Sequence, residues 1–227
     1  VHHLNIGREL ILDEKERQQL IELNIQAGRK ARDSSAHEES IRLFGVAYDA
    51  LPPNASETLY VHYKGHHRDL GEANYIVGET KAADKYFDRV LAIARTPQEK
   101  VRVYELKIAM HAAKGNRAEA VRLGLEVLEL LGIKIPARPS ESRLKSEMQS
   151  AQKMLHGKSP ERLIEVRPME DPEGLAAMRI CMQIATAAHT GTGHLFGVVI
   201  ARMIILSMKL GNAPASAYAY AAYAGLL

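Results

Sequence analysis

Histidines gather in one stretch of the chain, and their spacing could support metal chemistry. His62 and His66 lie one helical turn apart, and His67 and Asp69 follow closely. Two imidazoles at this spacing on a helix can share a Zn²⁺ ion. The His-Glu-x-x-His pattern of a catalytic zinc helix is missing, and His67 falls on a packing position. We therefore interpret these residues as surface and core histidines, and predict no metal site and no cofactor.

A glycine-rich stretch at residues 189–194 (HTGTGH) is the second candidate, because phosphate-binding loops are rich in glycine. It lacks the Lys-Ser/Thr pair of a P-loop and does not follow a predicted strand. A flexible turn between two helices is the simpler interpretation. No Gly-x-Ser-x-Gly elbow occurs, and the paired acids Glu38-Glu39 and Glu170-Asp171 suit surface or capping positions. We predict that the chain is not an enzyme.

Composition indicates which elements must position these residues. The chain has 227 residues, of which 46% are hydrophobic and 25% charged, as in globular proteins. Aromatic residues make up only 5% and Trp is absent, while Ala, Leu, Glu, Lys and Arg dominate. These residues favour helix over sheet. The composition therefore predicts an all-α fold.

The charge and cysteine content exclude several classes of partner and setting. The net charge is +3, and basic residues are scattered among acidic ones, so we predict no nucleic-acid partner. The single cysteine, Cys181, has no second thiol to pair with, which favours a cytoplasmic location. No signal peptide or apolar stretch of roughly 20 residues is present, so we predict no membrane span. The start at Val1 and the apolar end at Leu227 lead us to expect a piece of a longer polypeptide.

Residues 64–97 carry the most regular pattern in the chain. Gly78 follows Gly71 by seven residues, and Ala83 and Phe87 come after it at helical spacing. Small residues at one set of positions and large apolar residues at another predict two amphipathic helices packed together. A tight turn near Gly78 must join them.

The same reasoning predicts helices along the whole chain, separated by turn and capping residues. Asp13 is expected to cap one helix, Ser140 to begin another, and Pro52-Pro53 to end a third. An extended loop at residues 167–172 is a predicted hinge. A short helical turn is expected to open at Ser159-Pro160-Glu161. The expected helices cover residues 3–12, 14–32, 34–51, 56–77, 81–94, 101–110, 118–131, 140–156, 173–188, 195–210 and 215–227.

Two helix pairs share one plan, and a third follows it loosely. Gly28 and Phe44 fall at the same relative places as Gly71 and Phe87. In the third pair Gly115 aligns with Gly78. The residues at the expected Gly and aromatic positions of the third pair are Ile108 and Gly124.

Three such pairs, at about residues 21–54, 64–97 and 101–134, resemble tetratricopeptide repeats of about 34 residues. The resemblance implies a right-handed α-solenoid of helix hairpins with about 9–11 helices. Residues 1–134 would hold the helix pairs and 135–172 a connector with one amphipathic helix. Residues 173–227 would continue the solenoid.

Taken over its whole length, the chain also resembles a helical region of very large bacterial signalling proteins. Those proteins join a Ser/Thr-kinase-like domain, a STAND-type ATPase, a GAF domain and a sensor histidine kinase. Four phrases carry the resemblance: HLNIGREL at 3–10, LNIQAGRKAR at 23–32, GIKIP at 132–136 and LGNAPASAY at 210–218. The resemblance implies a regulatory arm of a larger ATPase-kinase protein.

In tetratricopeptide-like repeats the first helix of each pair lines a concave groove. The phase of the middle repeat predicts that this groove is lined by Arg29, Arg32, Arg68, Glu72, Tyr75 and Arg102. Four arginines near one groove can bind carboxylates or phosphates of a protein or peptide partner. The alternative is that they form ion pairs on a solvated surface.

Two functions follow from these patterns. The first is a non-catalytic protein-interaction or signal-relay scaffold, whose partners are proteins, peptides or other domains of the same polypeptide. The alternative is a small-molecule sensor that binds an apolar ligand in a pocket between the solenoid and the C-terminal helices. Its lining would include Met178, Met182, Met203 and Tyr218.

Overall fold

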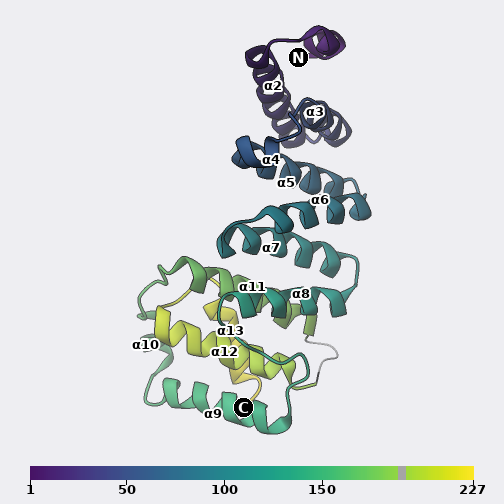
Figure 1. The fold of residues 1–227 in the computed structure, drawn as a ribbon. Coiled ribbons are helices and arrows are strands. Elements are labelled where there is room, and N and C mark those ends of the chain that lie inside the picture. Colours follow the sequence, from purple (N-terminus) through teal and green to yellow (C-terminus); the bar gives the residue numbers. More distant parts are fainter. Residues whose placement is uncertain (189–192) are drawn as a thin grey trace. The chain divides into compact units, whose positions relative to one another are not determined.

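The computed structural model describes residues 1–188 and 193–227 (Figure 1). These residues form α-helices and one 3-10 helix, with no strand among them, which confirms the predicted all-α class. The chain divides into two compact units, unit 1 at Val1–Glu99 and unit 2 at Lys100–Leu227. None of the described helices combines the length and apolar composition needed to cross a membrane.

Unit 1 is a series of helix pairs. Helix α2 pairs with α3 and α5 pairs with α6, while α3 packs against α5 (Figure 1). Its elements are α1 (His2–Ile6), η1 (Arg8–Leu10), α2 (Glu14–Asp33), α3 (His37–Asp49), α4 (Ala55–Thr58), α5 (Tyr60–Ile76) and α6 (Thr80–Ile93). Helix α7 (Pro97–Ala113) begins in unit 1 and continues in unit 2.

The first helices of unit 1 begin and end largely as their capping residues predict. The Asp13 carboxylate accepts hydrogen bonds from the backbone N–H groups of Lys15 and Glu16 at 2.9 and 3.0 Å, so it caps α2. Helix α3 ends just before Pro52-Pro53, as predicted. The predicted helix at residues 3–12 is interrupted at Gly7, which separates α1 from η1.

The glycine-aromatic plan of the two pairs is present in three dimensions. A Cβ atom on Gly28 would lie 2.6 Å from the Phe44 ring, and one on Gly71 would lie 2.5 Å from the Phe87 ring. Both rings have no exposed surface. Because glycine has no side chain, the phenylalanine ring of the second helix packs directly against the first helix of the same pair.

The turns that close three helix pairs have one backbone pattern. Ser35, Gly78 and Gly115 each have a positive φ, of 61°, 86° and 76°. In each turn the next residue donates its backbone N–H to the carbonyl five residues earlier, as in Glu79 to Asn74 at 2.9 Å. The turn predicted near Gly78 is therefore confirmed, and its geometry recurs before and after it.

The prediction of one long helix at residues 56–77 is wrong. The chain leaves helical geometry at Leu59, with φ −122° and ψ 39°, and this residue separates α4 from α5. The Thr58 hydroxyl donates to the Asn54 carbonyl at 3.1 Å, which is a local bond that competes with regular helix. Helix α5 restarts at Tyr60, whose hydroxyl reaches Glu99.

Unit 2 is built around α12, which packs against α9, α11 and α13, while α11 also packs against α8 (Figure 1). The Ser140 hydroxyl accepts from the Arg143 N–H at 3.2 Å, which confirms the predicted start of α9. The helices of unit 2 beyond α7 are α8 (Arg117–Leu130), α9 (Glu141–Leu155), α10 (Pro160–Ile164), α11 (Pro172–Ala188), α12 (Leu195–Leu210) and α13 (Ser216–Ala224).

Glycines of unit 2 make contacts of a different kind. A Cβ on Gly124 in α8 would lie 2.5 Å from Ile184 of α11. A Cβ on Gly197 in α12 would lie 2.6 Å from Leu144 of α9. These partners are more than 50 residues away in sequence, so close packing here joins helices of different pairs.

The loop predicted as a hinge at residues 167–172 is tied to the end of α12. Asn212 donates its backbone N–H to the Arg167 carbonyl at 2.8 Å, and Met169 donates to the Asn212 carbonyl at 2.9 Å. The Asn212 amide also donates to the Leu163 carbonyl at 2.7 Å. The two compact units instead divide within α7, and the predicted segments 1–134, 135–172 and 173–227 stay sequence-based predictions.

The predicted number of helices agrees with the longer elements. Thirteen α-helices occur in the described residues, and α1, α4 and α10 have only four or five residues each. The other ten are within the predicted range of 9–11. Of the three short helices, α1 lies in the predicted helix at residues 3–12 and α10 begins at the predicted short turn, while α4 was not predicted as a separate helix.

Candidate functional site

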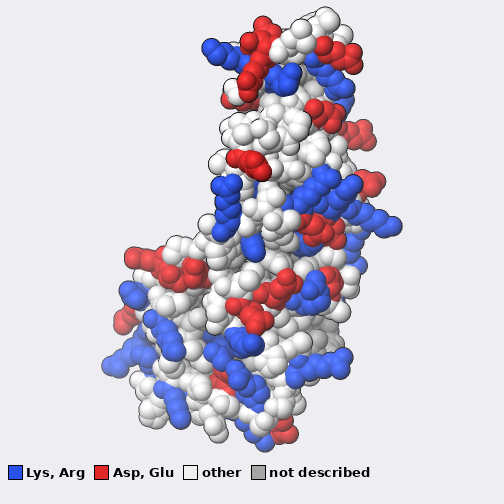
Figure 2. Space-filling view, viewed as in Figure 1, with Lys and Arg blue, Asp and Glu red and all other residues white. Residues whose placement is uncertain are grey.

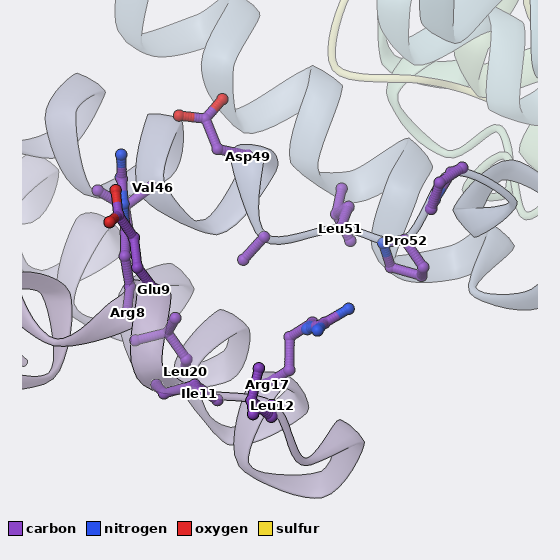
Figure 3. Close-up of a pocket in the computed structure, with 12 residues that line it drawn as sticks. Arg8, Glu9, Ile11, Leu12, Arg17, Leu20, Val46, Asp49, Leu51 and Pro52 are labelled. Carbon is purple, nitrogen blue, oxygen red and sulfur yellow. The ribbon is translucent and has the colours of Figure 1, made fainter.

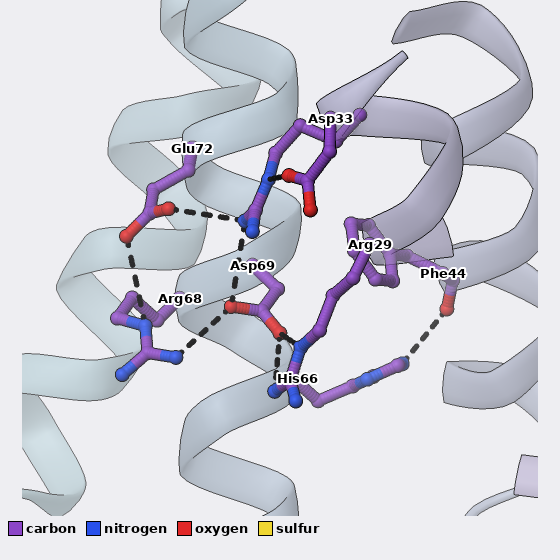
Figure 4. Close-up of polar contacts among 8 residues, drawn as sticks. Arg29, Asp33, Phe44, His66, Arg68, Asp69 and Glu72 are labelled. Atoms are coloured by element: carbon purple, nitrogen blue, oxygen red, sulfur yellow. Dashed lines mark hydrogen bonds and ion pairs between the residues drawn. The ribbon is translucent and has the colours of Figure 1, made fainter. Parts of the chain in front are cut away.

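An ion-pair cluster in unit 1 brings together four of the residues predicted to line a groove (Figure 4). Arg29 and Arg32 come from α2, and Arg68 and Glu72 come from α5. A fifth residue, Asp69 of α5, lies between the arginines. We call these five residues the arginine cluster.

The Asp69 carboxylate is the centre of the arginine cluster, with a side chain only 2% exposed. Its Oδ2 lies 2.8 Å from Arg29 Nη2 and accepts from Arg29 Nε at 2.9 Å. Its Oδ1 accepts from Arg68 Nη2 at 3.0 Å and lies 4.0 Å from Arg32 Nη1. Three guanidinium groups therefore compensate one buried carboxylate.

Glu72 extends the arginine cluster by one helical turn. Its Oε2 accepts from Arg32 Nη1 at 3.3 Å, and its Oε1 lies 3.6 Å from Arg68 Nε. That second pair is too long for a hydrogen bond, although both atoms are buried. Arg32 also pairs with Asp33 at 3.4 Å.

Helical spacing explains how the arginine cluster forms. Arg29 and Arg32 are three residues apart on α2, and Asp69 and Glu72 are three residues apart on α5, so each couple lies on one helix face. The two faces meet across a separation of 40 residues in sequence. The ion pairs therefore connect the first helix pair to the second.

The other two predicted groove residues do not join the arginine cluster. Tyr75 lies near the end of α5 and is half-buried. Arg102 lies on the part of α7 that belongs to unit 2 and is exposed. The predicted partner-binding role of the six residues stays a prediction, and the structure supplies the internal partners of four of them.

The candidate metal-binding histidines bind backbone carbonyls. His66 Nε2 donates to the Phe44 carbonyl at 2.8 Å, and His67 Nδ1 donates to the Tyr63 carbonyl at 2.9 Å. His62 is exposed on the surface. Among the described residues no group of three or more His, Cys, Asp or Glu side chains is arranged to hold a metal ion. The His66 bond therefore links α5 to α3, and the His67 bond joins two successive turns of α5.

Burial changes the acid-base behaviour of these rings. His66 is 2% exposed, and burial lowers its pKa to about 4, although the nearby Asp69 carboxylate opposes the shift. Burial also lowers the pKa of His67. The neutral His66 ring lies stacked with the Tyr48 ring at a centroid distance of 6.2 Å. Both imidazoles are therefore uncharged core groups at neutral pH.

A second cluster of polar contacts in unit 1 surrounds Glu99 at the start of α7. Glu99 accepts hydrogen bonds from the Lys64 ammonium, from the Tyr60 hydroxyl at 2.7 Å and from the Arg95 N–H at 2.8 Å. These bonds, with that of Lys64 the strongest, lower the pKa of Glu99 to about 2. Glu99 and Thr96 also bond each other's backbone N–H groups, which makes a capping box for α7.

The remaining reactive candidates of the sequence have a packing role or lie outside the described residues. Cys181 is fully buried in α11, and burial raises the pKa of its thiol to about 12. Residues 189–192 of the HTGTGH stretch lie outside the described residues. Met178 and Met203 have no exposed surface, so at these two positions the proposed apolar ligand pocket is filled core.

Charges on the surface are interleaved. Figure 2 shows Lys and Arg side chains next to Asp and Glu side chains over the visible face of the described residues. Many of them are pairs within one helix, such as Arg122 with Glu119 at 2.7 Å and with Glu126 at 3.0 Å. Exposed pairs of this kind contribute little to stability.

Sequence reasoning missed two features of this region. Asp69 was grouped with the histidines, because its pairing with Arg29 across 40 residues has no local signature. The capping box was visible in principle, since Thr96 and Glu99 have the Ser/Thr-x-x-Glu spacing ahead of an apolar helix. The Tyr60 and Lys64 contacts to Glu99 needed the fold.

A comparison with known proteins finds a distant, partial similarity to one signalling protein. The hybrid signal transduction histidine kinase G of Dictyostelium discoideum is 23% identical to it over 166 residues. That region covers 69% of the chain and 5% of the kinase, so the chain spans a small part of this relative. No protein-family model matches the chain, and the comparison with solved structures finds no match either. The tetratricopeptide resemblance therefore stays a prediction.

Proposed function

We propose that the chain is a non-catalytic interaction or signal-relay segment of a larger, cytoplasmic ATPase-kinase signalling protein. The observation that carries the proposal is the similarity to part of a signal-transduction histidine kinase, combined with a fold of helix pairs. The helix pairs would continue as a tetratricopeptide-like α-solenoid. Such an array transmits small changes of angle between neighbouring pairs.

The arginine cluster gives this relay a physical basis. Helices α2 and α5 belong to successive pairs, and charge pairs centred on Asp69 link them. Ion pairs respond to neighbouring charges and to salt more strongly than apolar packing does. The angle between the two pairs can therefore be adjusted without loss of either hydrophobic core.

An acidic partner could set this angle. Arg29 keeps 47% of its side chain exposed while it holds Asp69. A carboxylate on a partner protein, a peptide or an adjoining domain would compete with Asp69 or Glu72 for the arginines. A partner that prefers one arrangement would shift the population of the two. Arg102 and Tyr75 would add contacts only if the predicted groove includes them.

The proposal assigns no catalytic role to the chain. Its best nucleophile, Cys181, is a buried thiol with a raised pKa, and a thiolate is needed for reaction. The ring nitrogens of His66 and His67 that bond backbone carbonyls are unavailable as general bases.

The test uses the longer polypeptide that contains the chain. Arg29→Glu with Arg32→Glu removes the attraction to Asp69, and Arg122→Glu on α8 is the matched exposed control. Crosslinking with mass spectrometry would map contacts between this segment and other domains, and phosphotransfer would report the output. We expect the Arg29→Glu, Arg32→Glu double variant to change the crosslinks and the phosphotransfer, and the Arg122→Glu control to change neither. Unchanged crosslinks and unchanged phosphotransfer would contradict the proposal.

A further inference from the structure

Two charged regions of the molecule differ in whether their side chains converge. A cleft of about 450 Å³ in unit 1 is lined by Arg17 of α2 and Asp49 of α3 (Figure 3). Figure 3 shows the Asp49 carboxylate pointing away from Arg17, so these two charges do not face one ligand. In unit 2, by contrast, Arg143 of α9 and Arg202 of α12 converge on a single oxygen atom. We call Arg143 and Arg202 the arginine pair.

Glu147 of α9 supplies the oxygen atom that the arginine pair shares. Its Oε1 lies 2.7 Å from Arg143 Nη2 and accepts a hydrogen bond from Arg202 Nη2 at 2.6 Å. The two Nη2 atoms therefore cannot be further apart than the sum of these two distances. Two like charges are thus held side by side.

Helix packing holds the arginine pair in place without a ligand. Arg143 and Glu147 are four residues apart on α9, so they share one face of this helix. Arg202 reaches that face from α12, 55 residues beyond Glu147. Leu144 of α9 packs closely on α12, because a Cβ on Gly197 would lie only 2.6 Å from it. A site fixed in this way loses little entropy on binding.

One carboxylate does not compensate the arginine pair. Two guanidinium groups and Glu147 leave an excess of one positive charge. Among the described residues, neither Nε atom of the pair has a hydrogen-bond partner, although both Nε atoms are buried. Burial of a donor without a partner is unfavourable. The pair therefore has more charge and more donors than Glu147 satisfies.

The surroundings add little negative charge. The sequence from residue 174 to residue 227, which includes Arg202, contains no Asp or Glu. On α9, the Glu141 carboxylate is paired with the Lys145 ammonium at 2.6 Å. The Glu147 side chain is only 7% exposed, whereas the arginine pair keeps 40% and 30% of its side chains exposed. Solvent therefore meets mainly the cationic part of this group.

We propose that the arginine pair binds a phosphate group, either free phosphate or the phosphate of a monoester. A phosphate monoester carries a charge of roughly −1.5 to −2 at pH 7 and three acceptor oxygens, so it accepts hydrogen bonds from both guanidinium groups at once. A carboxylate carries one charge, and Glu147 contacts both arginines through one oxygen. The site is independent of the proposed relay function, because it rests on residues of unit 2 outside the arginine cluster.

Calorimetric titration of the full chain at constant ionic strength tests this site. Inorganic phosphate and an otherwise uncharged peptide with one internal phosphoserine are the two probes. We expect at least one probe to bind with a Kd on the order of 1 mM, and we expect chloride and the unphosphorylated peptide not to bind. Binding of inorganic phosphate alone indicates a site for the free anion, and tighter binding of the phosphopeptide indicates a phosphorylated partner. No binding of either probe, or an equal response to chloride, would overturn the proposal.

Variants of the full chain test the assigned arginines. Arg143→Gln and Arg202→Gln should each raise the Kd about tenfold or more, which is the loss expected for one charged hydrogen bond. Arg122→Gln is the matched control in unit 2 and should leave the Kd unchanged, because Arg122 already has two carboxylate partners. Melting temperatures without phosphate show whether each variant folds. Folded Arg143→Gln and Arg202→Gln variants with wild-type affinity would refute the site.

A third variant predicts a gain of affinity, which a merely structural role of these residues would not produce. Glu147→Gln removes the carboxylate that competes for the arginine pair and keeps a side chain of the same size. Phosphate should then bind about tenfold more tightly, because the charge of the pair is no longer compensated. Weaker binding of phosphate by a folded Glu147→Gln variant would contradict the proposed role of the pair.

Discussion

The two units use glycine for close helix contacts, but with different partners. In unit 1, Gly28 and Gly71 face phenylalanines of their own helix pairs. In unit 2, Gly124 faces Ile184 of a helix about 60 residues further on. Packing in unit 1 therefore repeats along the chain, while packing in unit 2 joins distant segments. The comparison teaches that a repeat can be read from sequence only where its contacts are local.

The largest expected effect tests the local contacts of unit 1. Phe87→Ala removes a fully buried ring from α6 and leaves a cavity beside Gly71. We expect the free energy of unfolding of unit 1 to fall by about 4 kcal/mol. Urea unfolding of the full chain gives the loss, and hydrogen exchange shows where it occurs. A loss below about 1 kcal/mol, or equal deprotection of unit 2, would contradict local packing.

The next effect tests how the two helix pairs of unit 1 are joined. Asp69→Ala leaves three arginines without their shared, buried carboxylate, so we expect a loss of about 3 kcal/mol in unfolding free energy. Asp33→Ala is the matched control, because Asp33 pairs with Arg32 but is 70% exposed. Its expected loss is below about 0.5 kcal/mol. Similar losses for both variants would show that the arginine cluster does not stabilise this joint.

The comparison of glycines can be sharpened by compensating substitutions. Gly124→Ala should cost about 2 kcal/mol of unfolding free energy, because its new Cβ meets Ile184. Ile184→Val should recover part of that loss, and Phe87→Leu should likewise recover part of the loss caused by Gly71→Ala. Double-mutant cycles from urea unfolding measure the coupling. Coupling between Gly124→Ala and Phe87→Leu would contradict the assignment of partners.

A smaller effect concerns pH and unit 1. Burial lowers the pKa of His66 from 6.5 to about 4, so the unfolded chain takes up a proton at a higher pH than the folded chain. Stability is therefore fully present above pH 6.5 and is lost as the pH falls toward 4, by about 1 kcal/mol at pH 5.5. His67, also lowered by burial, acts in the same direction.

Unfolding midpoints between pH 7.5 and 5 measure this dependence. His66→Gln keeps an N–H donor for the Phe44 carbonyl but has no titratable ring, so the slope with pH should become smaller. His62→Gln is the control, because His62 is exposed. An unchanged slope in His66→Gln would mean that another group causes the pH dependence.

Much of the fold of unit 1 could be predicted because its signals are local. The cap at Asp13, the stop at Pro52-Pro53 and the turn at Gly78 depend on residues close in sequence. The break at Leu59 was missed because the residues around it carry no Gly or Pro. The glycine-aromatic plan could also be predicted, because Gly71 and Phe87 belong to the same helix pair and are close in sequence.

The site was harder to predict than the fold. Helical phase correctly grouped Arg29, Arg32, Arg68 and Glu72, since residues three or four apart share a face. It could not show that Asp69 would be buried between the arginines, because that pairing depends on the angle between α2 and α5. Gly124 was aligned with an aromatic position, yet its partner Ile184 lies in another helix pair.

The most direct test of the relay is the distance between the first and second helix pairs. Spin labels attached through Lys30→Cys on α2 and Lys85→Cys on α6 report it, since the native Cys181 is buried with a pKa of about 12. We predict one narrow distance distribution at low salt. Asp69→Asn, or about 1 M salt, should shift or broaden it. An identical distribution in the Asp69→Asn variant would show that ion pairs do not set the angle, and would contradict the relay.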